Sequence, residues 1–224
     1  MRHCVWNGHE IPSFRRRAGK YGRPVARVAT DADANAVLAT LVAAFNRDPL
    51  WSWVCPDPLR RGAQHAGILG LYVECALPRG GVWMSDERAS AAAVFTRPGE
   101  SELSADAEER LDRFMTDQLG DHAPAVLETL RRFEAAAPAD PPFYYLSFLG
   151  THPDRRGSGI GMGLLAELVA EADREGSPTY LESTNPANNV RYERLGFRGQ
   201  DSFTTPDDLH TVTTMWREPA SSSR

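Results

Sequence analysis

The stretch HPDRRGSGIGMGLL, residues 152–165, places glycines at every second position between two arginines and an apolar run. Glycines at the start of a helix leave backbone N–H groups accessible, and a helix N-terminus attracts anions through these donors and its dipole. A Walker A loop needs Lys and then Ser or Thr after its last glycine, but Met162 and Gly163 stand there. A dinucleotide fingerprint needs the order G-x-G-x-x-G, which the period of two does not give. The stretch therefore predicts an anion-binding loop of neither type.

The length and composition favour one soluble domain. The chain has 224 residues, of which 42% are apolar and 25% charged, which is enough for one substantial core. No apolar run approaches the roughly 18 residues of a membrane span, and the first residues lack the apolar segment of a signal peptide. The three cysteines are far apart and without metal-site spacing. We therefore expect a cytoplasmic protein with no membrane partner and no metal.

Charge is distributed unevenly along the chain. Residues 1–24 contain six basic residues and one acidic residue, whereas the remainder contains 19 basic and 29 acidic residues, a net charge of −10. An acidic body argues against a nucleic-acid partner and favours cationic ligands. We expect residues 1–24 to form a basic, flexible tail, residues 25–217 to form the domain, and residues 218–224 to form a C-terminal tail.

Hydrophobic periodicity and turn residues predict alternating strands and helices in the domain. The apolar segment 143–149 reads as a central strand that leads into the glycine stretch, and an amphipathic helix follows. This order predicts a mixed sheet with helices on both faces. The expected elements are a strand at 25–30, a helix through 37–45, a loop at 46–58, a helix near 59–77, a hairpin at 81–96, helices near 105–119 and 123–136, a strand at 143–149, a helix ending at Gly176, a strand at 179–184, a short helix at 185–195 and two final strands.

Two motifs occur in a characteristic order. The first is R-x-x-G-x-G, formed by Arg156, Gly159 and Gly161 between a strand and a helix, and the second is YERLGF at residues 192–197. Together they resemble the GCN5-related N-acetyltransferase (GNAT) family over residues 25–217. The resemblance implies an α/β fold with a central mixed, mostly antiparallel sheet of about seven strands, and acetyl-CoA as cofactor. Within the family the motif spacing looks most like puromycin N-acetyltransferase and related antibiotic acetyltransferases.

The resemblance implies where coenzyme A would lie. Backbone N–H groups of the glycine loop would bind its pyrophosphate, and two arginine side chains would add positive charge. The edge of the preceding strand would pair with the pantetheine, and Gly150 would let it lie close. Of Asn185 and Asn188, one should cap the short helix and the other should contact the cofactor, a role for which Asn188 matches the related antibiotic enzymes better. The expected cofactor residues are Leu149, Gly150, Thr151, Arg155, Arg156, Gly157, Ser158, Gly159, Ile160, Gly161 and Asn188.

Acetyl transfer to an amine requires a proton acceptor for the amine, a proton donor for the thiolate and a hydrogen-bond donor for the developing oxyanion. The resemblance implies Tyr192 as the proton donor and the N–H of Leu149 as the oxyanion donor. Glu182 is the expected base, and its alternative role is a structural carboxylate. His152 and His210 are weaker candidates for the base. For the acceptor, Asp57 could attract an ammonium group, and Trp51, Trp53 and Tyr72 could form a pocket wall, although such aromatics are often core residues.

The expected function is an acetyl-CoA-dependent N-acetyltransferase that modifies the amine of a small molecule. An aminonucleoside or aminoglycoside-like antibiotic is the expected acceptor, and the protein is expected to be a monomer or homodimer. Two alternatives stay open. One is an acetyltransferase that modifies protein or peptide amines, and the other is an acyl-CoA-binding protein without catalysis.

Overall fold

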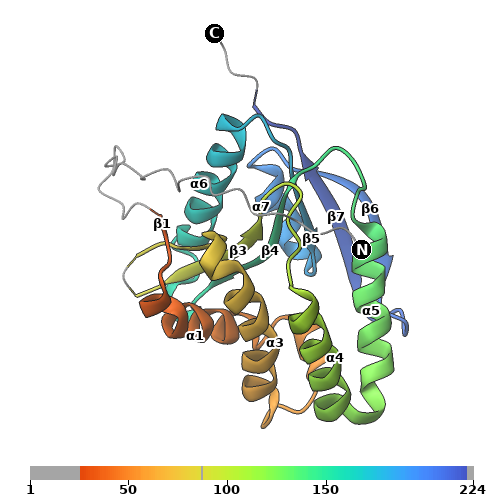
Figure 1. The fold of residues 1–224 in the computed structure, drawn as a ribbon. Helices are drawn as coiled ribbons and strands as arrows, with labels where there is room; N and C mark the ends of the chain where they lie inside the picture. The colour runs from red at the N-terminus through yellow and green to blue at the C-terminus, as the bar shows by residue number, and fades with distance from the viewer. Residues whose placement is uncertain (1–25, 87, 221–224) are drawn as a thin grey trace.

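The sheet contains seven strands in the order β1-β2-β3-β4-β5-β7-β6 (Figure 1). The computed structural model describes residues 26–86 and 88–220, so the expected basic tail lies outside it. Every strand pairs antiparallel with its neighbours except β4 and β5, which are parallel. The predicted sheet is thereby confirmed. The strands are β1 Arg27–Val28, β2 Val82–Met84, β3 Ala91–Thr96, β4 Tyr144–Thr151, β5 Thr179–Ser183, β6 Arg198–Thr204 and β7 Thr211–Arg217.

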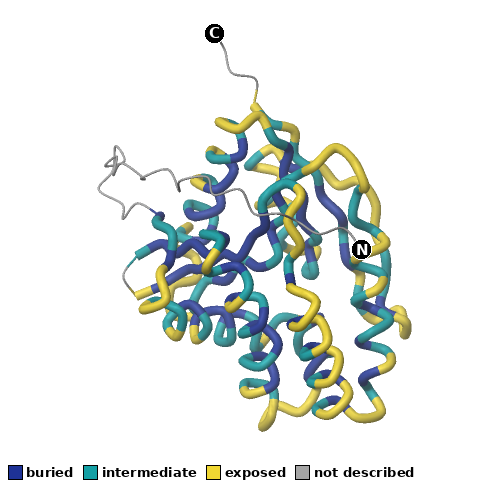
Figure 2. Tube along the Cα trace, viewed as in Figure 1, coloured by how far each residue is buried: buried dark blue, intermediate teal, exposed yellow. Residues whose placement is uncertain are grey.

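Helices cover both faces of the sheet. Ala91, Ala93 and Phe95 of β3 join the cluster around α6, and the intervening Ala92 and Val94 join the cluster around α1 and α3. This division follows from the alternation of side chains along a strand. Figure 2 shows the central strands as the most buried part of the chain. The helices are α1 Ala34–Phe45, α2 Pro49–Val54, α3 Arg61–Ala76, α4 Ala105–Leu119, α5 Ala123–Ala136, α6 Ile160–Arg174 and α7 Asn189–Glu193.

The helix α2 lies in a segment that the sequence predicts as a loop. Asp48 is its N-cap, and the Asp48 carboxylate accepts a hydrogen bond from the Trp51 N–H at 3.2 Å. Pro49 occupies the first helical position, where a missing N–H has no cost and the fixed φ suits a helix. The proline that suggested a loop is therefore part of a helix start.

The central strands β4 and β5 separate after a short parallel contact. Their register runs from Tyr144 opposite Thr179 to Leu146 opposite Leu181 and then ends. On its other side β4 stays paired with β3 as far as Thr151, with a bulge at Ser147. The second half of β4 therefore has one paired edge and one open edge, at the centre of the sheet.

The adjacent antiparallel strands β3 and β4 are joined by a hairpin of two helices, α4 and α5. A short turn would suffice for such a connection. The hairpin instead packs beside α3, as Figure 1 shows, and shares a second hydrophobic cluster with it. Ile68 of α3, Leu111 of α4 and Val126 of α5 are among its buried members. The bounds of both helices agree with those expected from the sequence.

Two further observations concern the described part of the chain. None of its helices is long and apolar enough to cross a membrane. At the end of the described residues, the Ala220 N–H donates to Asp173 of α6 at 2.7 Å, so the expected C-terminal tail begins with residues packed on the domain.

Candidate active site

The glycine loop has a backbone that requires some of its glycines. Gly157 and Gly159 have φ angles of 79° and 75°, a left-handed conformation that glycine adopts without steric cost. Gly161 has a different reason, because a Cβ there would overlap the Thr151 hydroxyl oxygen of β4. A Cβ on Gly163 would meet open space. The first three glycines therefore shape the loop and seat α6 on the sheet.

The loop presents free backbone donors at the start of α6. Within the described residues, the N–H groups of Gly157, Gly159, Ile160 and Gly161 donate to no backbone carbonyl outside regular elements, whereas those of Arg155, Arg156 and Ser158 close turns. The free groups stand at the positive end of a helix of 15 residues. This arrangement suits a phosphate group.

The two arginines of the loop differ. The Arg156 guanidinium donates to the Ala44 carbonyl oxygen of α1 at 2.7 Å and so ties the loop to the end of that helix. Arg155 is exposed and forms no ion pair within the described residues. Arg155 is therefore the side chain better placed to add charge to a bound anion.

The open edge of β4 presents alternate backbone groups. The His152 N–H donates to the Ser90 carbonyl oxygen next to β3, so the N–H groups of Thr151 and Leu149 point toward the opposite, open edge. Gly150 also has a packing role that the sequence did not indicate. A Cβ there would lie 3.0 Å from side-chain atoms of both Ala44 and Leu41, so its small size admits α1, and its expected closeness to a cofactor stays a prediction.

A cavity of about 800 Å³ lies beside the separation of β4 and β5. The hairpin α4–α5 forms one wall, and α2, α3 and the strands form the others. The predicted residues Trp51, Tyr72, Leu149, Glu182, Asn188 and Tyr192 line this cavity. The cavity also contains Asp48, Glu102, Glu108, Asp112, Glu134, Tyr145, Ser147 and Phe148, which the sequence analysis did not single out.

Two glutamates give the cavity its polar character. Burial raises the pKa of Glu182 to about 7; the Tyr145 and Tyr180 hydroxyls lower it in part and the charge of Glu102 raises it further. Burial also raises the pKa of Glu102 to about 7, against the effect of Ser147. Neither carboxylate forms an ion pair with any described residue. Both groups can therefore exchange protons near neutral pH.

Tyr192 of α7 also lines the cavity. Burial raises its pKa to about 12, and the charge of Asp48 adds to the shift. The hydroxyl therefore keeps its proton at neutral pH and can donate it. Burial raises the pKa of Asp48 itself to about 6, despite its contact with the Trp51 N–H and the charge of Arg156.

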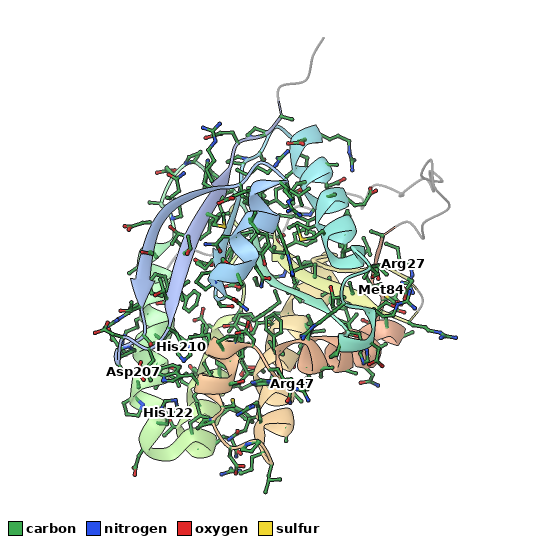
Figure 3. The ribbon with its side chains drawn as sticks, turned by 180° about the vertical axis from the view of Figure 1, so that it is seen from behind. Arg27, Arg47, Met84, His122, Asp207 and His210 are labelled. Atoms are coloured by element: carbon green, nitrogen blue, oxygen red, sulfur yellow. The ribbon has the colours of Figure 1, made fainter. Side chains whose placement is uncertain are left out.

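Several predicted residues lie away from the cavity. The Trp53 indole N–H donates to the Asp207 carboxylate at 2.7 Å, and its ring lies 4.7 Å from that of His122 and 6.1 Å from that of His210. Figure 3 shows His122, Asp207 and His210 gathered at one end of the molecule. The indole thus connects α2, the α4–α5 turn and the β6–β7 loop, so the structure gives Trp53 and His210 no contact with the cavity.

The remaining polar candidates have local structural roles. Asp57 accepts the Leu59 N–H at 2.9 Å in a turn, and His152 accepts the Asp154 N–H at 3.4 Å; neither lines the cavity. Asn185 caps the short helical turn by accepting the Ala187 N–H at 3.1 Å. This leaves Asn188 as the asparagine that faces the cavity.

Two of the cavity residues that the sequence analysis missed differ in how they could have been found. A local sequence motif could have pointed to Asp48, whereas no such motif surrounds Glu102. An Asp before Pro is a typical helix start. Glu102 lies in an irregular segment between β3 and α4, and only the fold brings it to the cavity. Among the described residues no group of three or more His, Cys, Asp or Glu is arranged to hold a metal ion.

Comparison with known proteins gives concordant matches. The family model described as an acetyltransferase (GNAT) domain matches residues 126–199. An uncharacterized N-acetyltransferase of Schizosaccharomyces pombe is 34% identical over 83 residues, which are 36% of this chain and 34% of that protein. The match thus spans about a third of the length of this relative.

Solved structures extend the similarity to most of the chain. A structure described as histone acetyltransferase HPA2 and related acetyltransferase, from Corynebacterium glutamicum, is 26% identical, with a TM-score of 0.65 over 90% of this chain and 99% of the other. The polyamine N-acetyltransferase of Drosophila melanogaster is 16% identical, with a TM-score of 0.58 over 87% of this chain and 99% of the other; this likeness shows the fold alone. These matches support the prediction that the protein is an acetyltransferase. They do not support the predicted particular similarity to puromycin N-acetyltransferase.

Proposed function

We propose that this chain, which has the GNAT fold and carries a GNAT acetyltransferase domain, transfers an acetyl group from acetyl-CoA to the amine of a small molecule. The observation that carries the proposal is the single cavity that extends from Tyr192 to Glu182 at the separation of β4 and β5. It brings a protonated hydroxyl and a carboxyl that titrates near neutral pH into one space. Those are the two proton-transfer groups that the reaction needs.

The residues around the loop fit coenzyme A. The free N–H groups of Gly157, Gly159 and Gly161 would hold the pyrophosphate at the start of α6, with Arg155 beside them. The open edge of β4 at Leu149 and Thr151 would hydrogen-bond the pantetheine amides. When bound, acetyl-CoA supplies an acetyl group activated as a thioester.

Three groups of this chain would then carry out the transfer. Glu182, as carboxylate, accepts a proton from the acceptor's ammonium group, directly or through water, so that the nitrogen can react. The N–H of Leu149 donates to the negative charge that develops on the acetyl oxygen. The Tyr192 hydroxyl would donate a proton to the departing thiolate, and the second proton that the nitrogen loses as the amide forms would replace it through water, so that one proton is released overall through Glu182.

A second candidate function is the modification of protein amines. It is favoured by the likeness to the structure described as a histone acetyltransferase and related acetyltransferase, which is 26% identical. The hairpin α4–α5 argues against it, because its side chains form a wall of the cavity where a peptide would need an open groove. An antibiotic acceptor has no support from these relatives and enters only as one arm of the test.

The test is release of free thiol from acetyl-CoA in the presence of diamines, monoamines, aminoglycosides, aminonucleosides or lysine peptides. We expect acetyl-CoA alone to raise the melting temperature by mass action, and small amines to be acetylated faster than peptides. Thiol release with peptides only would favour protein modification. A raised melting temperature without thiol release from any acceptor would identify a non-catalytic acyl-CoA-binding protein.

A further inference from the structure

The lining of the cavity carries more negative charge than its own basic residues compensate. Six acidic residues line the cavity, Asp48, Glu102, Glu108, Asp112, Glu134 and Glu182, against a single basic residue, Arg131. Arg131 already pairs with Glu128 on its own helix at 3.0 Å. The cavity therefore offers no free cation of its own to these carboxylates among the described residues.

Two buried polar atoms of the cavity favour a ligand with N–H donors. Glu182 Oε1 and Ser147 Oγ are shielded from solvent and have no partner at hydrogen-bond geometry within the described residues, although the Tyr145 and Tyr180 hydroxyls are close enough to Glu182, and Ser147 to Glu102, to lower the pKa of each carboxyl. Both residues line the cavity. A buried carboxylate oxygen and hydroxyl without partners are costly to maintain, and a ligand with N–H donors would satisfy them.

The acidic residues lie around two tyrosines of the cavity. Burial raises the pKa of Tyr145, and the charges of Glu102 and Glu182 add to this. Burial likewise raises the pKa of Tyr72, and the charges of Glu102, Glu134 and Glu108 add to this. Glu102 is common to both sets, so it links Glu182 of β5 to the acidic residues of the two hairpin helices.

We infer that the acceptor is a linear amine with a second fixed positive charge, such as a diamine, a polyamine or a guanidino-amine. The inference rests on the proposed function. The reacting nitrogen lies at Glu182, and the second cation lies between Glu102 and Glu134. The aromatic rings of Tyr72 and Phe148, whose centroids are 5.0 Å apart, would cover the methylene groups of the amine between its two nitrogens. Aromatic faces also attract nearby cations.

Charge balance favours two cationic groups over one. The reacting ammonium group transfers one proton to Glu182, and its nitrogen loses a second proton as the amide bond forms and the carbon–sulfur bond breaks; that second proton balances the one that Tyr192 gives to the thiolate, and the product amide is neutral. With a monoamine, Glu102 would have no cation in the cavity itself, since Arg79, whose charge lowers its pKa, lies outside the lining, and with a pKa of about 7 it would stay partly protonated. A second fixed cation keeps that carboxylate paired from binding to product release.

The test compares acceptors that differ in the second nitrogen alone. We expect kcat/KM for 1,5-diaminopentane to exceed that for pentylamine about 30-fold or more, with agmatine among the good acceptors. Glu102→Gln should lower the ratio of kcat/KM for the diamine to kcat/KM for pentylamine about 10-fold, mainly through KM of the diamine, whatever it does to the rate with both acceptors through its effect on Glu182. Glu109→Gln, on the same hairpin but outside the cavity, makes the same change in net charge and should affect neither.

A calorimetric titration of 1,5-diaminopentane in the absence of acetyl-CoA separates this inference from the proposed function. Binding that weakens in Glu102→Gln supports the cation site even if no thiol is released, in which case the proposed catalysis fails alone. Monoamines that are acetylated as efficiently as diamines would overturn the inference and leave the proposed function standing. Equal diamine affinity of wild type and Glu102→Gln would also overturn it.

Discussion

The glycine loop and the α4–α5 hairpin are built in opposite ways. The loop uses backbone groups of consecutive residues, 155–161, and its geometry depends on glycines at fixed positions. The hairpin wall uses side chains that converge from α2, α3, α4, α5 and the strands. A ligand common to many enzymes can be bound by a local motif, whereas acceptor selection depends on the tertiary fold.

The difference also concerns charge. Backbone donors and Arg155 make the loop a site for anions, and the opposite wall is acidic. The molecule therefore has a site that suits a phosphate at the start of α6 and an acidic cavity that suits an amine, and Tyr192 and Glu182 line the latter. Each of the following experiments tests one side of this comparison, in order of decreasing expected effect.

The largest effect is expected from Glu182→Gln, which removes the proposed base without changing its size. We expect kcat at pH 8 to fall about 100-fold or more, because general-base catalysis contributes roughly 10²–10⁴, while acetyl-CoA affinity stays the same. The pKa of about 7 predicts that the wild-type rate rises with pH up to that value, since the deprotonated form is active. A Gln variant that retained this pH dependence would show that another group is the base.

Tyr192→Phe tests the proton donor at the loop side. The hydroxyl keeps its proton because its pKa is raised to about 12, and its loss should lower kcat about 10-fold or more. The dissociation constant of acetyl-CoA, measured by calorimetry, should change little, because the ring remains. Unchanged turnover would remove Tyr192 from the mechanism.

Gly161→Ala tests the loop itself. Its Cβ would overlap the Thr151 hydroxyl oxygen and displace the first turn of α6, so we expect acetyl-CoA to bind about 10-fold more weakly, on the scale of a lost charge-assisted hydrogen bond. Gly163→Ala is the matched control on the same helix, because its Cβ would meet open space. The double variant Gly161→Ala with Thr151→Ala should recover much of the affinity, and failure to do so would contradict the packing explanation.

Glu102→Gln should stabilise the protein at pH 8. Its pKa is raised from 4.5 to about 7 in the folded state, so between these values the folded state binds more protons than the unfolded state and stability falls as pH rises. The neutral amide of Gln does not bury a charge at pH 8, so the variant avoids this loss of stability. We expect its melting temperature at pH 8 to be higher than that of wild type, by about 2–4 °C for each kcal/mol of unfolding free energy regained. The difference in melting temperature between variant and wild type should shrink at pH 5. A lower melting temperature of the variant at pH 8 would contradict burial as the cause of the raised pKa of Glu102.

The smallest effect on activity is expected from Trp53→Phe. The indole lies outside the cavity and ties three segments together through Asp207 and the ring of His122. We expect kcat/KM within about 2-fold of wild type and a melting temperature a few degrees lower, since one hydrogen bond to a charged group contributes roughly 1.5–3 kcal/mol. A large loss of activity with unchanged stability would show that Trp53 contacts the substrate.

The sequence predicted what depends on local pattern. The order of strands and helices along the chain, the two helices of the hairpin and the glycine loop follow from periodicity, caps and turn residues. The helix α2 was missed because its Asp and Pro were interpreted as loop residues. The reason for Gly150 was also beyond the sequence, because it depends on how closely α1 crosses β4.

The acceptor side was predicted less completely. Trp51, Tyr72 and Glu182 line the cavity as expected, but Trp53 and Asp57 do not. Residues only two positions apart, such as Trp51 and Trp53 in α2, point to different parts of a helix surface. Glu102 could not be found from the chain, because an acidic residue in an irregular segment is usually solvated.

The α4–α5 hairpin connects two strands that are neighbours in the sheet, and this has a consequence for how the protein can evolve. A connection of this kind can change in length and sequence while β3 and β4 keep their register. The glycine loop at residues 155–161 lies outside this connection. Mutations in α4 and α5 can therefore change which amine is accepted while the proposed coenzyme A site is preserved. Substitutions in these two helices, rather than in the glycine motif, are where divergence in substrate choice should accumulate.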